Sequence, residues 1–332
     1  MLPATVDPMS TDLAPAAATP SITLEQGVAI RAALDAALAP GTQVAYASSW
    51  RTWSTWCEAH GHQPMPAHPL SLAAWVTERA TALSVSTITK DLAAVRAAHE
   101  AAGVDDPTAG RDLRLVMKGL RRTYGVAPRK QAHPVTTAEL RRVLGAIDRK
   151  TLRGKRDAAI LLTGYAGALR RGELAALRVG DVAFAAAGAV ITLRRSKSDQ
   201  EGQGAVVGIV RGQHSETDPV SALREWLRAA DVSGEDALFQ RIAPGARKAM
   251  GRGMSGQSIA TVLTARANAA GLDDLPISGH SLRAGHATQA SEAGVAATRI
   301  ARTTRHARLE TLAKYVRPAE ALADSTSSEL GL

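Results

Sequence analysis

The sequence contains very little cysteine and few aromatic residues. Cys57 is the single cysteine among 332 residues, so no disulfide can form within the chain, and we expect a reducing compartment such as the bacterial cytoplasm. Cys57 lies near His60 and His62, but these three residues have no credible fourth zinc ligand, so we interpret Cys57 as a packed helix residue. Tyrosine occurs only four times, at Tyr46, Tyr124, Tyr165 and Tyr315.

Long apolar runs and the signatures of several enzyme classes are also missing. No stretch reaches the roughly 20 apolar residues of a membrane span. The N-terminus has no basic start followed by an apolar run, so we expect no secretory signal. There is no G-x-x-x-x-G-K-[ST] loop for a nucleotide, no H-E-x-x-H motif, and Asp273–Asp274 lacks the partners of a two-metal nuclease. We therefore expect neither a cofactor nor a metal.

Positive charge is abundant. The chain has 40 Lys and Arg against 31 Asp and Glu, a net charge of +9. Such an excess indicates a polyanionic partner, most commonly nucleic acid, although a solvated basic surface is the alternative. Hydrophobic residues make up 45% of the chain, which is enough for ordinary cores, and the length favours two domains.

The first part of the chain has only helical patterns. Residues 1–20 are rich in Pro, Ala and Thr and predict a flexible tail. Residues 21–124 then predict a helical domain, whose first helix starts at a capping box over Thr23–Gln26. In the second helix, Tyr46, Trp50, Trp53 and Cys57 share one face, which predicts core. Further helices are expected over residues 70–83, 86–103 and 109–125.

A basic stretch with two prolines separates this part from the rest, and we place a linker at 125–135. Residues 136–332 form the second predicted domain, which opens at a capping box of Thr136 and Glu139. The runs 189–195 and 205–211 are rich in β-formers and flank a polar turn, so they predict a hairpin. The fold class is therefore mainly α with a small β hairpin, and helices are expected over about 137–149, 155–168, 219–230, 256–270, 280–293 and 308–316.

Two short motifs place charged side chains on one helix face. Arg170 and Glu173 in "ALRRGEL" are i, i+3 neighbours, as are His280 and Arg283 in "HSLR". An arginine fork and an imidazole near a helix N-terminus can bind phosphate oxygens. Alone, the pair of Arg170 and Glu173 is more typical of a solvated surface, and the pair of His280 and Arg283 is only suggestive.

Three further residues complete the set. Lys197 lies between the two motifs, and His306 and Tyr315 follow both of them. This ordered set resembles the tyrosine recombinase (phage integrase) family, in a layout like that of Cre and XerD. The carrying motifs are "ALRRGEL", "HSLR" and "RHARLETLAKYVRP", and the resemblance covers nearly the whole chain. One departure is Arg305, which occupies the position before His306 where the family usually has glycine. In the hairpin, Arg194 and Arg195 lie close to Lys197.

The resemblance implies a two-domain DNA clamp, with an N-terminal helical core-binding (SAM-like) domain and a catalytic domain. It implies site-specific recombination through a 3′-phosphotyrosyl intermediate, with Tyr315 as the nucleophile. Arg170 and Arg283 would bind the phosphate, His280 would help move the tyrosine proton, and Lys197 would protonate the leaving oxygen. Glu173 would orient its surroundings, and His306 would hydrogen-bond the phosphate.

The implied partners are double-stranded DNA and further copies of the chain, two on each site and four in the synapse. Two alternatives stay open: a type IB topoisomerase, which would share the chemistry, and a non-enzymatic DNA-binding relative. Of the other tyrosines, Tyr46 and Tyr165 are predicted core residues. Tyr124 lies at the linker, where it would pack or touch DNA. His286 is predicted to be structural.

DNA contacts outside the catalytic set are also predicted. Thr87 and Lys90 lie at the start of the helix over 86–103, where small hydroxyls and a lysine suit a helix end that meets DNA. The alternative is simple capping by Ser86 with a solvated Lys90. Basic residues in and before the linker are expected to bind the DNA backbone: Arg121, Arg122, Arg129 and Lys130.

Overall fold

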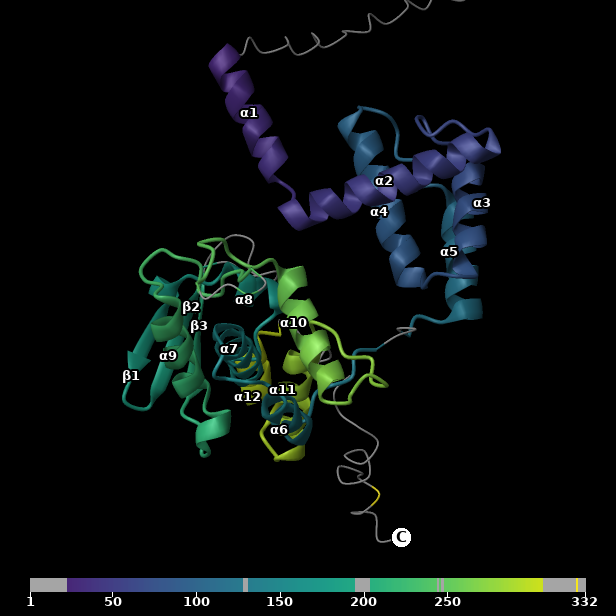
Figure 1. The fold of residues 1–332 in the computed structure, drawn as a ribbon. Helices are drawn as coiled ribbons and strands as arrows, with labels where there is room; N and C mark the ends of the chain where they lie inside the picture. Colours follow the sequence, from purple (N-terminus) through teal and green to yellow (C-terminus); the bar gives the residue numbers. More distant parts are fainter. Residues whose placement is uncertain are drawn as a thin grey trace, which may run out of the picture. The chain divides into compact units, whose positions relative to one another are not determined.

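The computed structural model describes residues 23–127, 131–194, 204–243, 245, 248–306 and 327 (Figure 1). The chain divides into two units, Met1–Ala127 and Pro128–Leu332. Helices dominate both units, and a small three-stranded antiparallel sheet lies in the second. The mainly α fold class with a small β element is confirmed. Among the described residues, no helix is both long and apolar enough to cross a bilayer.

In the N-terminal unit, α2 (Pro40–His60) packs against α4 (Val85–Ala101), and α3 (Pro69–Ala80) packs against α5 (Arg111–Tyr124). The predicted capping box at its start is present, because the Thr23 amide donates to Gln26 Oε1 (2.8 Å) and the Gln26 amide donates to Thr23 Oγ1 (3.1 Å). The helices are α1 (Leu24–Ala36), α2 (Pro40–His60), α3 (Pro69–Ala80), α4 (Val85–Ala101) and α5 (Arg111–Tyr124).

The predicted apolar face of α2 is confirmed for its second half only. Trp53 and Cys57 are fully buried, and Trp50 packs against the same cluster. Burial raises the pKa of the Cys57 thiol to about 11, so it stays protonated as a packed residue. Tyr46 is only half-buried and lies outside the cluster, so its prediction as core was wrong. At that end of α2 the interface with α4 is polar, since buried Ser49 donates to Asp91 Oδ1 (2.6 Å).

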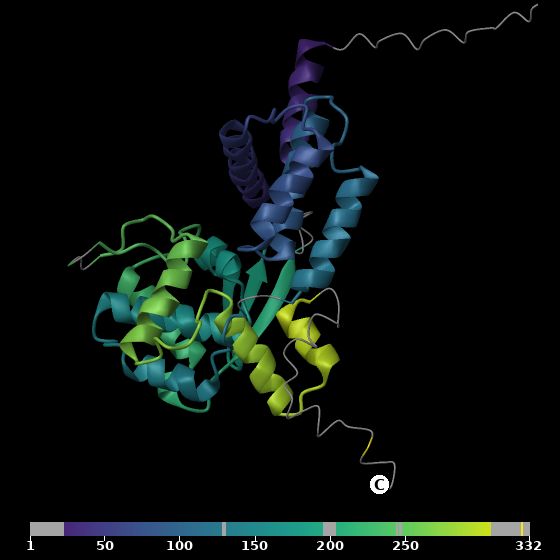
Figure 2. The same cartoon turned by 90° about the vertical axis from the view of Figure 1, so that its right-hand side faces the viewer.

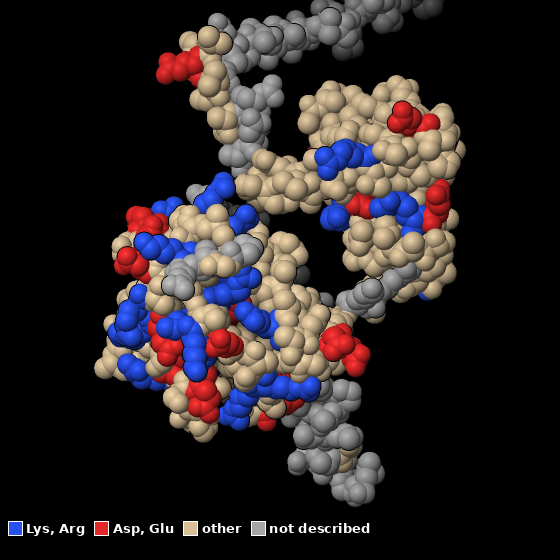
Figure 3. Space-filling view, viewed as in Figure 1, with Lys and Arg blue, Asp and Glu red and all other residues tan. Residues whose placement is uncertain are grey.

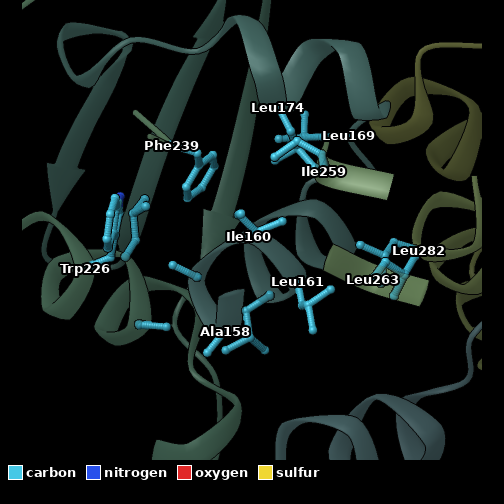
Figure 4. Close-up of a cluster of buried hydrophobic side chains, with 14 of the residues drawn as sticks. Ala158, Ile160, Leu161, Leu169, Leu174, Trp226, Phe239, Ile259, Leu263 and Leu282 are labelled. Carbon is cyan, nitrogen blue, oxygen red and sulfur yellow. The ribbon is translucent and has the colours of Figure 1, made fainter. Parts of the chain in front are cut away.

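The C-terminal unit is arranged around α7 (Leu152–Ala166), which is buried along most of its length. Ile160 and Leu161 of α7 lie in a cluster to which α8 (Arg171–Ala176), α9 (Pro219–Ala230) and α10 (Gly256–Ala269) contribute apolar side chains (Figure 4). Gly164 lets two leucine side chains pack closely on α7, since a Cβ at this position would lie 2.9 Å from Leu174 Cδ1 and 3.0 Å from Leu282 Cδ1. The remaining described helices are α6 (Thr137–Gly145), α11 (Ser281–Glu292), α12 (Ala297–Thr304) and the short 3₁₀ turns Val179–Asp181 and Ser215–Thr217.

The predicted hairpin consists of β2 (Gly188–Leu193) and β3 (Ala205–Val210), paired antiparallel from Gly188↔Val210 to Leu193↔Ala205. A further strand, β1 (Val182–Ala185), pairs with β2 and gives the order β1-β2-β3. The buried side chains of the sheet point to one side, where β3 contacts α7 and α9. They are Ala189, Ile191, Leu193, Val207 and Ile209.

Helix α11 is fixed to the chain segment that enters this unit. The Val135 amide donates to the Ser281 carbonyl (3.1 Å). A Cβ at residue 285 would lie 1.8 Å from the Val135 carbonyl oxygen, so only glycine permits this approach. The predicted capping box of Thr136 and Glu139 follows immediately. Helices α11 and α12 contact each other and are the two yellow helices side by side in Figure 2.

Candidate active site

Arg170 lies between α7 and α8, as the residue that precedes the first turn of α8. Its backbone amide donates to Glu173 Oε2 (2.8 Å), and its Nη1 donates to Glu173 Oε1 (2.6 Å). The structure therefore brings this predicted pair together through the backbone as well as the side chain. Burial alone would raise the pKa of the Glu173 carboxyl, but the Arg170 amide and the charges of Arg305 and Arg170 outweigh it and lower the pKa below its ordinary value.

Arg283 belongs to the first turn of α11 and is almost fully buried, with 1% of its surface exposed. Its Nη1 donates to the carbonyl oxygen of Ala168 (2.9 Å), two residues before Arg170. Arg283 is thus bonded to the same turn that carries Arg170. His280 precedes α11 directly and is exposed, and its amide donates to Ser278 Oγ (3.3 Å).

His306 follows α12 and lies among the same cationic groups. Burial, followed by the charges of Arg283, Arg170, His280 and Arg305, lowers its pKa to about 4. His306 is therefore neutral at neutral pH. The Thr304 hydroxyl donates to the Ile300 carbonyl (2.7 Å), so its oxygen accepts from His306 Nδ1–H (2.7 Å). In this neutral tautomer the other ring nitrogen, Nε2, is a hydrogen-bond acceptor.

Arg305 is a site residue whose contacts the sequence did not predict. Its Nη2 donates to Glu173 Oε2 (2.8 Å) and to the Ala168 carbonyl (3.1 Å). It therefore binds the same carboxylate as Arg170 and the same carbonyl as Arg283. The departure from glycine before His306 was the available signal, but the sequence alone does not tell where the side chain goes.

The structure describes the two strands of the hairpin but not residues 195–203 between them, and it describes the C-terminal motif only as far as His306. The last pair of the β2–β3 ladder is Leu193↔Ala205, and the chain between them carries Lys197. Arg194 at the start of this connection donates through Nε to Asp181 Oδ1 (2.7 Å). Lys197, Arg195 and Tyr315 lie outside the described residues, as does the helix expected over 308–316.

Two further predicted residues have mainly structural contacts. Tyr165 is partly buried against the core and its hydroxyl pairs with Thr137 Oγ1 (2.9 Å). His286 Nδ1–H donates to the Tyr165 carbonyl (2.9 Å). Burial lowers the pKa of His286, with the Tyr165 hydrogen bond opposing this shift.

The start of α4, where Thr87 and Lys90 were predicted to meet DNA, is capped by the residue that precedes the helix. The capping residue is Ser84, whose Oγ accepts from the Thr87 amide (3.3 Å), so the alternative of capping by Ser86 was wrong. Thr87 is half-buried, and its Oγ1 also bonds Ser84 Oγ (2.9 Å). Lys90 is about half exposed and its Nζ lies 3.6 Å from Asp91 Oδ1. The contacts of Thr87 and Lys90 with DNA stay a prediction.

Arg121 and Arg122 are exposed in the last turn of α5, whereas Arg129 and Lys130 lie outside the described residues. On the face of the C-terminal unit shown in Figure 3, basic and acidic side chains are interspersed over the surface. Tyr124 at the end of α5 is 41% exposed. The contacts of these basic residues with the DNA backbone therefore stay a prediction.

Comparison with known sequences identifies the family of this site. Residues 134–321, more than half of the chain, match the phage integrase family. The chain belongs to the phage integrase family. Its members break and rejoin DNA strands, and the chain is accordingly a site-specific DNA recombinase.

Individual family members match most of the chain. The integrase/recombinase xerD homolog of Selenomonas ruminantium is 30% identical over 300 residues, which cover 90% of this chain and 87% of that protein. The recombinase Cre of Escherichia phage P1 is 24% identical over 283 residues, covering 80% and 81%. In fold, the Tn1549 transposon integrase in complex with transposon right end DNA has a TM-score of 0.58 at 15% identity, covering 92% of this chain and 98% of that one.

Proposed function

We propose that this recombinase cleaves DNA by attack of the Tyr315 hydroxyl oxygen on a backbone phosphorus. A bond forms between the tyrosine oxygen and phosphorus, and the bond from phosphorus to the 5′ oxygen of the next nucleotide breaks. The 3′-phosphotyrosyl ester keeps the energy of the broken bond. A 5′ hydroxyl from a partner strand then reverses the step and releases Tyr315, so no hydrolysis and no nucleotide is needed.

The observation that carries this proposal is the meeting of Arg170, Arg283 and His306, which come from three distant segments. Arg170 donates to Glu173 and Arg283 donates to the Ala168 carbonyl, and after burial the charges of these two arginines lower the pKa of His306. Arginine forks suit the non-bridging oxygens of a phosphate that gains negative charge during attack. Glu173 orients Arg170, since it is itself held by the Arg170 amide.

The two histidines have different proposed roles. The low pKa of His306 makes it a weak base, so we assign transfer of the Tyr315 proton to His280, which precedes α11 at the surface. His306 Nε2 is an acceptor in the neutral tautomer, which suits a hydroxyl proton better than an unprotonated phosphate oxygen. We therefore place His306 beside the Tyr315 hydroxyl before attack, with contact to the phosphate limited to the protonated ring.

Lys197 is the proposed general acid for the leaving 5′ oxygen, because it lies in the connection between β2 and β3. A 5′-bridging phosphorothiolate substrate tests this role, since a thiolate leaves without a proton. Lys197→Ala should be slow on ordinary DNA and close to wild type on the sulfur substrate. Equal impairment on both substrates would assign the acid to another residue.

Duplex DNA is the proposed partner, bound by both units, with two protomers on each site and four in the synapse. The dimer on a site is supported by the lambda integrase, which was solved as a dimer bound to a core site. Arg121, Arg122, Arg129 and Lys130 are proposed to bind phosphates, and Thr87 and Lys90 to influence the choice of site. The buried, protonated Cys57 is compatible with a reducing compartment such as the cytoplasm.

The decisive experiment traps the covalent intermediate. A nicked suicide substrate carrying the cognate site should yield a protein–DNA adduct that survives denaturation, in the presence of EDTA as well as Mg²⁺. Tyr315→Phe should form no adduct and still bind the site, while Tyr46→Phe, at a residue outside the buried cluster of the N-terminal unit, serves as the matched control and should form it. An adduct that persists in Tyr315→Phe would place the nucleophile elsewhere, and strand transfer without any adduct would exclude the mechanism.

A further inference from the structure

The backbone at Arg305 adopts a conformation that favours glycine. Its φ and ψ are 54° and 48°, and it ends α12 as the left-handed residue. A side chain in this region is disfavoured relative to the right-handed conformation because its Cβ lies too close to the following carbonyl oxygen, and glycine is the usual residue at such helix ends. An arginine here therefore needs contacts of its side chain that offset this cost.

The guanidinium group makes those contacts, and the Arg305 side chain is only 11% exposed. Nη1 donates to the carbonyls of Thr303 (2.8 Å) and Gly167 (3.3 Å). Nη2 donates to the Ala168 carbonyl (3.1 Å) and to Glu173 Oε2 (2.8 Å). The end of α12 is thus bound to the turn between α7 and α8 that precedes Arg170.

Both acceptors of Nη2 are shared with the proposed phosphate-binding arginines. Glu173 also accepts from Arg170 Nη1 (2.6 Å), and the Ala168 carbonyl also accepts from Arg283 Nη1 (2.9 Å). Arg170 Nη2 in turn lies 3.5 Å from the Arg305 carbonyl. With Arg305 present, two guanidinium charges face the Glu173 carboxylate. Without it, the whole attraction of this buried carboxylate would fall on Arg170 and draw it away from a phosphate.

We propose that Arg305 is a positioning residue for the cleavage step: it shares the Glu173 carboxylate and the Ala168 carbonyl, and so holds Arg170 and Arg283 in the arrangement that binds the phosphate. This inference rests on the proposed function of those two arginines. Arg305 acts through them and makes no contact with the reacting atoms. The glycine that its backbone favours would keep the turn and lose this link.

The test compares Arg305→Gly, Arg305→Gln and Arg305→Lys in single-turnover cleavage of a suicide substrate at saturating protein. Small misplacements of catalytic groups slow reactions strongly, so Gly and Gln should lower the cleavage rate about tenfold or more. Lysine keeps the charge and one donor direction, and should restore part of the rate. Site binding should change little. Arg302→Gln, which removes an exposed charge from the same helix, should cleave like the wild type.

A purely structural role is separated by a double-mutant cycle with Glu173→Gln. Once the carboxylate is neutral, removal of Arg305 should slow cleavage less than it does in the wild type, because only its contacts with backbone carbonyls remain to be lost, so the two effects are not additive. Asp231→Gly relieves another left-handed residue far along the chain and controls for backbone strain. Wild-type cleavage by folded Arg305→Gly, or additive effects in the cycle, would overturn the proposal. If Tyr315→Phe still forms the adduct, only the assigned nucleophile is lost, and the cycle is read on that adduct.

Discussion

Two carboxylates of the C-terminal unit each bind two arginines, and they do so in different ways. Asp157, on α7, uses one oxygen for two nitrogens of Arg156 (2.9 and 2.7 Å) and the other for two nitrogens of Arg266 (2.9 and 2.6 Å). Glu173 receives a single guanidinium nitrogen from each of Arg170 and Arg305, and takes the Arg170 backbone amide as a third donor.

This difference distinguishes the Asp157 cluster, which stabilises the fold, from the Glu173 cluster, which orients residues of the candidate site. In the interior cluster the carboxylate binds two of the three guanidinium nitrogens of each arginine, and the Arg156 Nη1 donates to the Gln240 carbonyl (3.2 Å). In the Glu173 cluster only one side-chain nitrogen of Arg170 faces the carboxylate. An arginine that must bind phosphate needs donors that the protein does not already use.

The largest effect should come from Asp157→Asn. This change leaves two buried or half-buried guanidinium charges without a carboxylate, and breaking such a pair typically costs about 3–5 kcal/mol. We expect that loss in the free energy of unfolding, measured in urea near neutral pH. Glu225→Gln, which removes the exposed partner of Arg149, should cost less than about 1 kcal/mol. Similar losses of unfolding free energy in both variants would contradict a special role of the Asp157 cluster in stability.

Arg170→Ala should show the reverse pattern. Removing a donor to developing charge slows a reaction by about 10²–10³-fold, so we expect the single-turnover cleavage rate to fall at least about 10²-fold. The free energy of unfolding should change less than in Asp157→Asn, because Glu173 keeps Arg305 and a backbone amide. Arg171→Ala removes the exposed neighbour, which bonds Gln257, and should leave the rate near wild type. A matching loss of site binding would contradict a role in the chemical step.

The smallest effect concerns pH. The pKa of His306 is lowered from 6.5 to about 4, so between these values the unfolded chain takes up a proton that the folded chain does not. Stability should therefore fall as the pH falls through this window, and less so in His306→Gln. The pKa of Glu173 is also lowered, so its contribution is present above 4.5 and is lost only below that value. Glu173→Gln should thus leave the slope between 6.5 and 4.5 unchanged in urea unfolding, and an altered slope would contradict the assignment.

What the sequence predicted well depends on local chemistry. The capping box of Thr136 and Glu139 and the hairpin runs follow from residues a few positions apart. Strand β1 was missed because its four residues include two alanines and no run of β-formers. Helix α12 was missed because Ile300 is its only buried large apolar residue.

The candidate site was likewise predictable only where its contacts join residues that are close in the sequence. Arg170 and Glu173 are found by spacing, since one turn of α8 sets their contact. The role of Arg305 depends on the approach of α12 to the turn at Gly167 and Ala168, more than 130 residues earlier. No local pattern encodes that meeting. A positive φ at Arg305 is likewise a property of the folded chain, where the side-chain contacts offset it.

Val135 attaches the chain segment that enters the C-terminal unit to α11 at two points. The Val135 amide holds the Ser281 carbonyl, and the Val135 carbonyl lies where Gly285 has no side chain. Arg283 lies between these two attachment points on the same helix. Arg283 is therefore held on both sides, at Ser281 and at Gly285, by a single residue of the segment that enters this unit.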